Sequence, residues 1–217
     1  MNERNPMIID RNTGVLWNSL IVTLIFALTA PCVTAETTAE SESTPTAVVE
    51  AFQNELIAVM KAAPELGYRG RYARLAPAVR RSHDIATISR ISVGSYWDGL
   101  DRAQQARLVE TFGDLSISTY AERFDGYSGE RFDTQSSGDL SAEVAGVRSL
   151  LMKADGGEIQ FDYVLHKDDR GWRIVNIVVD GVSDLALKRA EYAEILSRDG
   201  FHALIAALKE KIAANAQ

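Results

Sequence analysis

The chain has 217 residues, with 23 lysines and arginines against 30 aspartates and glutamates, and a formal net charge of −7. With 46% hydrophobic and 24% charged residues, it has the composition of an ordinary globular protein. The acidic balance argues against a nucleic-acid-binding protein, which would carry a basic patch. A single cysteine excludes a disulfide framework and a multi-thiolate metal site.

The first 35 residues are predicted to be a secretory signal peptide. An apolar run at 15–28 follows Arg4 and Arg11 and leads to the small-residue sequence at 33–35, which is the order of features in a cleavable signal. The run is shorter than the roughly 18 residues expected of a spanning helix. Cleavage after Ala35 would place the remaining chain in the periplasm with no cysteine and an unchanged net charge. Retention as an N-terminal anchor is the alternative, because two acidic residues cancel the arginine charges.

Residues 36–44 are small, polar and acidic and are predicted to be a disordered linker, followed by a single domain at 45–217. Apolar residues at helical spacing predict a mostly helical first half of this domain. Four helices are expected. The first begins at Pro45 and is ended by Pro64, the second covers 71–81, the third covers 85–93, and the fourth runs from its capping residue Asp101 to about Phe124.

After Gly126 the apolar period changes to that of strands. Four are expected, at 131–135, 144–153, 158–166 and 172–182, and the short turns between the last three predict an antiparallel meander. Two helices separated by Gly200 finish the chain. The predicted fold class is therefore α+β, with an antiparallel sheet of about four strands packed against the helical half and the two C-terminal helices.

The last predicted strand is apolar on both faces, unlike 158–166, whose apolar residues share one face. A strand of this kind must be covered on both sides. Two interpretations stay open from the pattern alone: a central strand flanked by helices, or a strand with one side facing an apolar cavity. The two alternating sets are Trp172, Ile174 and Val178, and Val175, Ile177 and Val179.

No pattern of catalytic or metal-binding residues emerges. None of the three histidines has another histidine or a carboxylate at the spacing of a zinc motif. No Gly-x-Ser-x-Gly motif is present, and no glycine-rich phosphate loop follows a strand. Asp168 and Asp169 fit a hairpin turn. We therefore expect no enzyme activity, catalytic residue, metal site or cofactor.

The cationic residues cluster at one place in the sequence. Five arginines lie between residues 69 and 81. The cluster fits a solvated helix face, and its functional alternative is a docking patch for a partner or for anionic headgroups.

The C-terminal third carries a recognisable run of residues. The sequence WRIVNIVVDGVS at 172–183 leads into KRAEY at 188–192 and then GFHALIAAL at 200–208. This run resembles the MlaC family, also called the toluene-tolerance Ttg2 auxiliary proteins, and GVSDLALKR at 181–189 is most similar to its HpnM branch, which is associated with hopanoid biosynthesis. Asn176 departs from the aspartate that is usual in the family.

The resemblance implies a monomeric periplasmic carrier that holds lipid tails in a cavity between sheet and helices. Such a carrier moves phospholipid or hopanoid between the inner and outer membranes, which maintains outer-membrane lipid asymmetry. Its partners would be an inner-membrane ABC transporter with an MCE-domain subunit and an outer-membrane lipoprotein complex, with no nucleic acid involved. An apolar tail needs enclosed apolar area rather than a catalytic group, because each buried CH₂ is worth ~0.8 kcal/mol.

With this resemblance, the cavity interpretation of the last strand is favoured. We expect lipid tails to contact Val175, Ile177 and Val179, or Trp172, Ile174 and Val178 if the strand's parity is inverted. Weaker candidates for tail contacts are Phe161, Tyr163, Trp97, Phe112 and Tyr120.

Two other functions stay open. The chain could be a non-catalytic interaction module of a hopanoid-related membrane assembly that carries no lipid itself. An enzyme acting on an isoprenoid would need a carboxylate pointing into an apolar cleft, for which Asp162, Asp180 and Asp184 are the candidates.

Overall fold

The computed structural model describes residues 44–217, so the predicted signal peptide and nearly all of the predicted linker lie outside the described residues. Helices make up both ends of this part of the chain. They are α1 (Pro45–Lys61), α2 (Ala63–Ser82), α3 (Ile85–Val93), the 3₁₀ helix η1 (Gly94–Gly99), α4 (Arg102–Arg123) and α5 (Asp184–Asn215). Between α4 and α5 run the strands β1 (Arg131–Ser141), β2 (Val144–Met152), β3 (Glu158–Asp168), β4 (Gly171–Val179) and β5 (Val182–Ser183).

Four of the α-helices, α1, α3, α4 and α5, begin where a side chain accepts a hydrogen bond from one of the first free amides. The Thr44 hydroxyl accepts from the amide of Ala47 at 3.2 Å, directly before Pro45. Asp101 and Gln104 form a reciprocal capping box at the start of α4, each side chain accepting from the other residue's amide. These caps fix the starts of two helices that form much of the helical layer.

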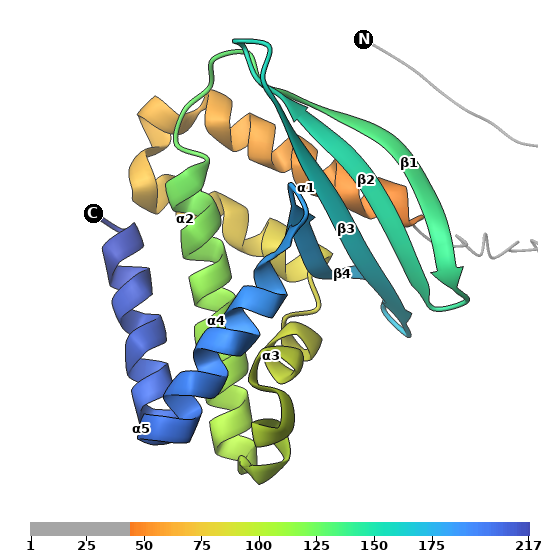
Figure 1. Ribbon diagram of the computed structural model, residues 1–217. Coiled ribbons are helices and arrows are strands. Elements are labelled where there is room, and N and C mark those ends of the chain that lie inside the picture. Colours follow the sequence, from red (N-terminus) through yellow and green to blue (C-terminus); the bar gives the residue numbers. More distant parts are fainter. Residues whose placement is uncertain (1–43) are drawn as a thin grey trace, which may run out of the picture. The chain divides into compact units, whose positions relative to one another are not determined.

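The strands form one antiparallel meander in the order β1-β2-β3-β4-β5. Figure 1 shows β1 to β4 side by side in this order. The predicted α+β class and meander are confirmed. Two details differ, because β1 runs six residues beyond its predicted end and the two-residue β5 was not expected. Gly156, with φ 84°, lies in the turn before β3, and Gly171, with φ 93°, is the first residue of β4, where the chain leaves the preceding turn.

A β-bulge in β4 corrects the predicted alternation of that strand. Leu165 of β3 pairs with Ile174, whereas the preceding Val164 pairs with Asn176, so Val175 is an extra residue in the ladder. Because a bulge inserts one residue, the side-chain alternation shifts at this point. Neither predicted set of three therefore forms a single face. Trp172 and Ile174, before the bulge, lie on the same face of the sheet as Ile177 and Val179, after it, because all four pair with alternate residues of β3, from Phe161 to Lys167.

The helices cover one side of the sheet. In Figure 1, α1 crosses behind the strands, while α3, α4 and α5 lie beyond β4 at the opposite end from the free edge β1. The junction of α2 and α3 is joined directly to the sheet, since the Asp84 amide donates to the Ile174 carbonyl at 2.9 Å. The buried apolar residues form two clusters, one between α1, α2 and the sheet and one between α3, α4 and α5.

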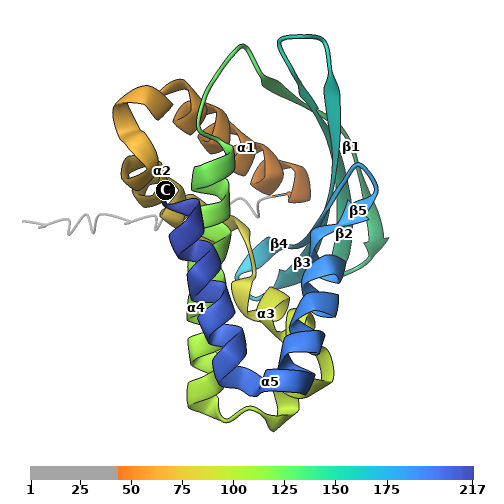
Figure 2. The same ribbon diagram turned by 60° about the vertical axis from the view of Figure 1, so that its left-hand side comes forward.

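The long helix α5 contains a sharp change of direction. Gly200 has φ 79° and ψ −176°, and the two halves of α5 run in different directions from this point (Figure 2). This agrees with the predicted pair of C-terminal helices separated by Gly200. No helix within residues 44–217 is long and apolar enough to cross a membrane.

Candidate functional site

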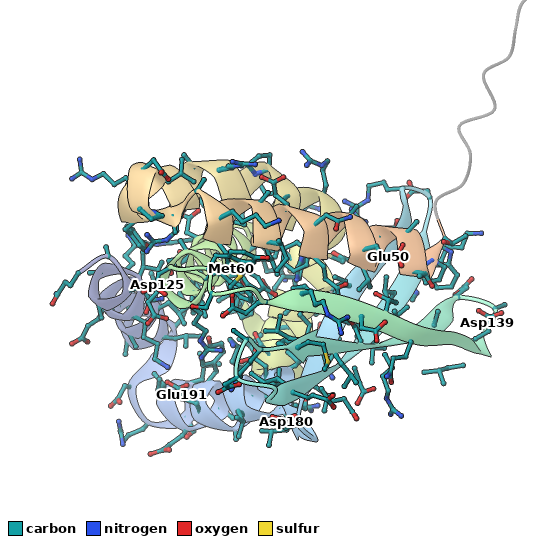
Figure 3. All side chains as sticks on the ribbon, turned by 90° about the horizontal axis from the view of Figure 1, so that it is seen from above. Glu50, Met60, Asp125, Asp139, Asp180 and Glu191 are labelled. Carbon is teal, nitrogen blue, oxygen red and sulfur yellow. The ribbon has the colours of Figure 1, made fainter. Side chains whose placement is uncertain are left out.

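A cavity of about 410 Å³ lies between the inner face of the sheet and the helices. Seen from above, Met60 lies on the inner side of α1 and Asp139 at the far end of the sheet (Figure 3). Most of the lining is apolar or aromatic and comes from α1, α4, β3 and β4. Its apolar and aromatic members are Phe52, Leu56, Met60, Ile88, Phe112, Tyr120, Phe124, Leu151, Ile159, Phe161, Tyr163, Ile174, Val175, Ile177, Val179 and Leu185.

Several of these apolar side chains face the interior yet are only half-buried. Phe161 and Ile177 pack against the first hydrophobic cluster without being enclosed by it, and Val179 and Ile159 also keep intermediate exposure. Protein interiors are normally packed as densely as organic crystals. Apolar area left open on the core side of the sheet therefore indicates space for an apolar ligand.

The structure brings together seven of the eight residues expected to contact a ligand. Val175, Ile177, Val179, Phe161, Tyr163, Phe112 and Tyr120 all line the cavity. Trp97 does not: it lies in η1 and packs against the second cluster, between α3, α4 and α5. Ile174, from the inverted set, also lines the cavity, because the bulge at Val175 puts Ile174 on the same face as Ile177 and Val179.

A set of buried polar groups forms part of the cavity wall. The Ser82 hydroxyl donates to the Ala78 carbonyl at 2.8 Å, so it accepts from His83 Nδ1 at 2.8 Å. His83 Nε2 then carries no proton and accepts from the Tyr120 hydroxyl at 3.1 Å. Burial lowers the pKa of His83 to about 4 and raises that of Tyr120, so both groups are neutral near pH 7.

A second polar contact links α1 to the sheet beside the cavity. The Gln53 side-chain amide donates to the Tyr163 hydroxyl at 3.2 Å and its oxygen accepts from Thr134 at 3.2 Å. The polar wall is thus hydrogen-bonded within the protein and uncharged. It positions aromatic rings, with Phe52 edge-on to His83 at 4.9 Å between ring centroids.

Five charged residues also line the cavity, and three of them, Arg123, Lys153 and Asp184, are exposed to solvent. Arg123 and Lys153 are exposed, and neither forms an ion pair with any residue the structure describes. Lys188 pairs with Asp184 at the start of α5. This arrangement places an apolar interior beside a charged mouth.

Comparison with known proteins identifies the family of this fold and cavity. The sequence profile of a family described as MlaC protein matches residues 50–210. The chain belongs to the MlaC family.

Two relatives of this MlaC-family chain are informative. It is 25% identical over 122 residues to the intermembrane phospholipid transport system binding protein MlaC of Haemophilus influenzae, covering 54% of this chain and 57% of that protein. The chain thus matches little more than half the length of this curated relative. A phospholipid-binding protein of Ralstonia solanacearum, solved with a phospholipid, has the same fold, with a TM-score of 0.72 at 21% identity over 81% of this chain and all of that one.

The carboxylates considered for catalysis do not form a buried acid/base site. Asp162 is paired with Arg148 at 2.6 Å, and Asp180 is exposed and accepts from the Gln160 amide at 2.9 Å. Asp184 lines the cavity mouth but keeps 56% of its side chain exposed. Within residues 44–217, no group of three His, Cys, Asp or Glu side chains could hold a metal ion. The structure therefore gives the enzyme hypothesis no support.

Three of the arginines at 69–81 make contacts within the fold. Arg71 donates to the Ala121 carbonyl at 2.7 Å, Arg74 pairs with Glu55 at 2.7 Å, and Arg80 pairs with Asp114 at 3.2 Å. The cluster mainly holds α2 against its helical neighbours, which favours the interpretation as a helix face.

Sequence reasoning missed the contribution of α1 to the site. Phe52, Leu56 and Met60 follow one another at four-residue spacing, which predicts a helix face but not what that face contacts. In the sequence, His83 is an isolated histidine. Its hydrogen bond to Tyr120 joins residues 37 positions apart, and no local signal indicates such a contact.

Proposed function

We propose that this MlaC-family chain is a periplasmic lipid-binding component of intermembrane lipid transport, with the acyl chains of a phospholipid occupying the cavity. The observation that carries the proposal is the set of half-buried apolar side chains around a 410 Å³ space on the core side of the sheet. The volume lies within the range typical of ligand pockets, roughly 300–1,000 Å³. The names of the Haemophilus and Ralstonia relatives support phospholipid as the cargo.

The energetics suit a carrier that binds lipid without chemistry. Each CH₂ removed from water contributes ~0.8 kcal/mol, so enclosure of part of an acyl chain gives substantial affinity. The lining residues Phe161, Ile177 and Val179 offer apolar area that is already held open by the fold. The cost of ordering the protein on binding is therefore small.

The finer parts of the proposal rest on family membership and resemblance. We propose that the chain receives or delivers lipid at an inner-membrane ABC transporter with an MCE-domain subunit and at an outer-membrane lipoprotein complex. Hopanoid is the alternative cargo, in accord with the resemblance of residues 181–189 to the HpnM branch. The competing function is an interaction module that carries no lipid.

Native mass spectrometry of the purified protein tests the proposal. We expect co-purified lipid on the wild type, and fragmentation of the complex would identify it as phospholipid or hopanoid. Ile177→Trp should reduce the lipid-bound fraction at least tenfold, because the larger ring would occupy the cavity beside Tyr163. Val182→Trp is the matched control, since Val182 is 52% exposed and does not line this cavity.

Circular dichroism would confirm that both variants remain folded. A wild-type protein that is free of lipid and does not take up lipid from vesicles would support the interaction-module function instead.

A further inference from the structure

The connection between α4 and β1 runs along the mouth of the apolar cavity. It covers residues 124–130, and in Figures 1 and 2 it rises beyond α4 to the end of the sheet that carries the β2–β3 turn. Its first and last residues, Phe124 and Glu130, both line the cavity, as does Lys153, where the chain enters that turn. The connection therefore forms one side of the charged mouth.

The middle of this connection, residues 125–129, is called the strap here and has few contacts with the rest of the fold. All five of its residues are exposed. The Ser128 amide donates to the Glu130 carboxylate at 2.6 Å, and no other hydrogen bond within the described chain involves the strap. A segment with exposed backbone groups and few apolar contacts opens at low cost in free energy.

One side-chain contact ties the strap to the helices. The ammonium group of Lys61, the last residue of α1, lies 5.1 Å from the centre of the Tyr127 ring. Tyr127 is 41% exposed, so this cation–π contact is of the weak, solvent-exposed kind. Met60, the neighbour of Lys61, lines the cavity. The contact therefore joins two sides of the mouth.

Two glycines give the strap positions at which its backbone can turn. Gly129 has φ 117°, a conformation that favours glycine. It lies beside the β2–β3 turn, since a Cβ built on it would meet the Ala154 side chain at 3.8 Å. A Cβ built on Gly126 would meet nothing within 4 Å. Loop residues of this kind can absorb the changes of φ and ψ that a hinge requires.

We propose that the strap is a gate for the lipid cargo, and that the contact between Lys61 and Tyr127 is the latch that holds it closed. When the latch parts, the strap moves away from the β2–β3 turn and widens the mouth for an acyl chain. A latch that closes over the empty and the loaded protein alike slows both entry and exit and leaves the equilibrium affinity unchanged. The inference rests on the proposed function, since it needs a cargo that passes the mouth.

Reversible cross-linking of the strap tests the gate. In a Cys32→Ser background, which leaves no other cysteine in the chain, Lys61→Cys and Tyr127→Cys are joined by a short bis-methanethiosulfonate reagent that dithiothreitol removes. Transfer of pyrene-labelled phosphatidylglycerol between vesicles should be about tenfold slower or more in the cross-linked protein than in the wild type. After reduction it should be faster than in the wild type, because the latch is then absent. The control pair, Glu194→Cys and Arg198→Cys, lies one turn apart on exposed α5 and should transfer at the wild-type rate when cross-linked.

Single substitutions test the latch itself. Tyr127→Ala should speed transfer about two- to fivefold, as expected for loss of an exposed cation–π contact, and should leave the lipid-bound fraction at equilibrium unchanged in native mass spectrometry. Tyr127→Phe keeps the face of the ring and should transfer at the wild-type rate. Tyr96→Ala is the matched control, because Tyr96 is 38% exposed and does not line the cavity.

The outcomes distinguish a wrong gate from a wrong function. Cross-linked protein that transfers lipid at the wild-type rate would show that lipid enters elsewhere and would overturn the inference. A Tyr127→Phe variant as fast as Tyr127→Ala, or a lowered bound fraction in Tyr127→Ala, would overturn the latch. If the wild type neither binds nor transfers lipid, the carrier function itself fails.

Discussion

His83 shows how burial changes the chemistry of a single residue at the cavity wall. The residue is 5% exposed, and its ring is held between Ser82 and Tyr120 in the neutral form. A protonated imidazole there would lose water and would have no carboxylate partner in the hydrogen-bonded set. This is why the pKa of His83 is lowered to about 4 from an ordinary value near 6.5.

The lowered pKa predicts a specific dependence of stability on pH. Between pH 6.5 and 4 the unfolded chain binds a proton at this histidine and the folded protein does not, so the free energy of unfolding falls as the pH falls through this range. From pH 7 to pH 5 the loss should be about 2 kcal/mol. We expect His83→Gln to remove this loss, so that its free energy of unfolding differs less between pH 7 and pH 5 than that of the wild type. Urea unfolding at both pH values would measure it.

The exposed His202 provides the control for this experiment. His202→Gln should keep the wild-type difference between the two pH values. If His83→Gln kept the wild-type difference in unfolding free energy between pH 7 and pH 5, the buried ring would not be the group responsible.

At the scale of single elements, one glycine determines the course of α5. Gly200 combines φ 79° with ψ −176°, a backbone region that is essentially restricted to glycine. A Cβ built there would meet nothing within 4 Å, so any penalty for a side chain arises from the backbone alone. Both halves of α5 line a second, polar pocket beside α4, because the chain turns at this residue.

Substitution at Gly200 should therefore be costly without any steric clash. Gly200→Ala is expected to lower the free energy of unfolding by about 1–3 kcal/mol. Gly99→Ala is the matched control, because its Cβ also meets open space and Gly99 has an ordinary φ. Equal stability of the two variants in denaturant titrations would argue against strain at the bend of α5.

At the scale of the whole molecule, the open cavity makes stability depend on bound ligand. The described domain leaves apolar area unfilled between its two hydrophobic clusters, since Ile88 and Phe112 from one and Phe52 and Ile174 from the other line the same space. A ligand that binds only the folded state stabilises it according to its concentration relative to Kd. The cargo of the proposed carrier would then also complete its core.

Delipidated protein should therefore respond to a soluble short-chain phospholipid. Its thermal midpoint should rise with concentration, and the gain in free energy of unfolding should reach about 2.7 kcal/mol at 100 times Kd. Differential scanning calorimetry would measure the shift. Phosphorylethanolamine at the same concentration should give a much smaller one, because it lacks tails, and an equal shift would show that the apolar cavity is not the site of stabilisation.

Much of the architecture was predictable because it depends on local patterns. The starts of α1 and α4 follow from Thr44 and Asp101, and the apolar face of β3 follows from simple alternation. The MlaC family was also recognisable from residues 172–208, and the profile match confirms it. Membership of the HpnM branch, the cargo and the lipid contacts stay predictions.

The sequence by itself determined most of the elements, their order and the apolar character of the strand at 172–182, because periodicity and capping act over a few residues. It missed β5, the far end of β1 and the first turns of α2. Only the tertiary structure decided which side chains line the cavity. The bulge at Val175 arises from pairing with β3, and it turns Ile174 and Ile177 to the same side, which strict alternation forbids. The contact of His83 with Tyr120 likewise depends on packing between distant segments.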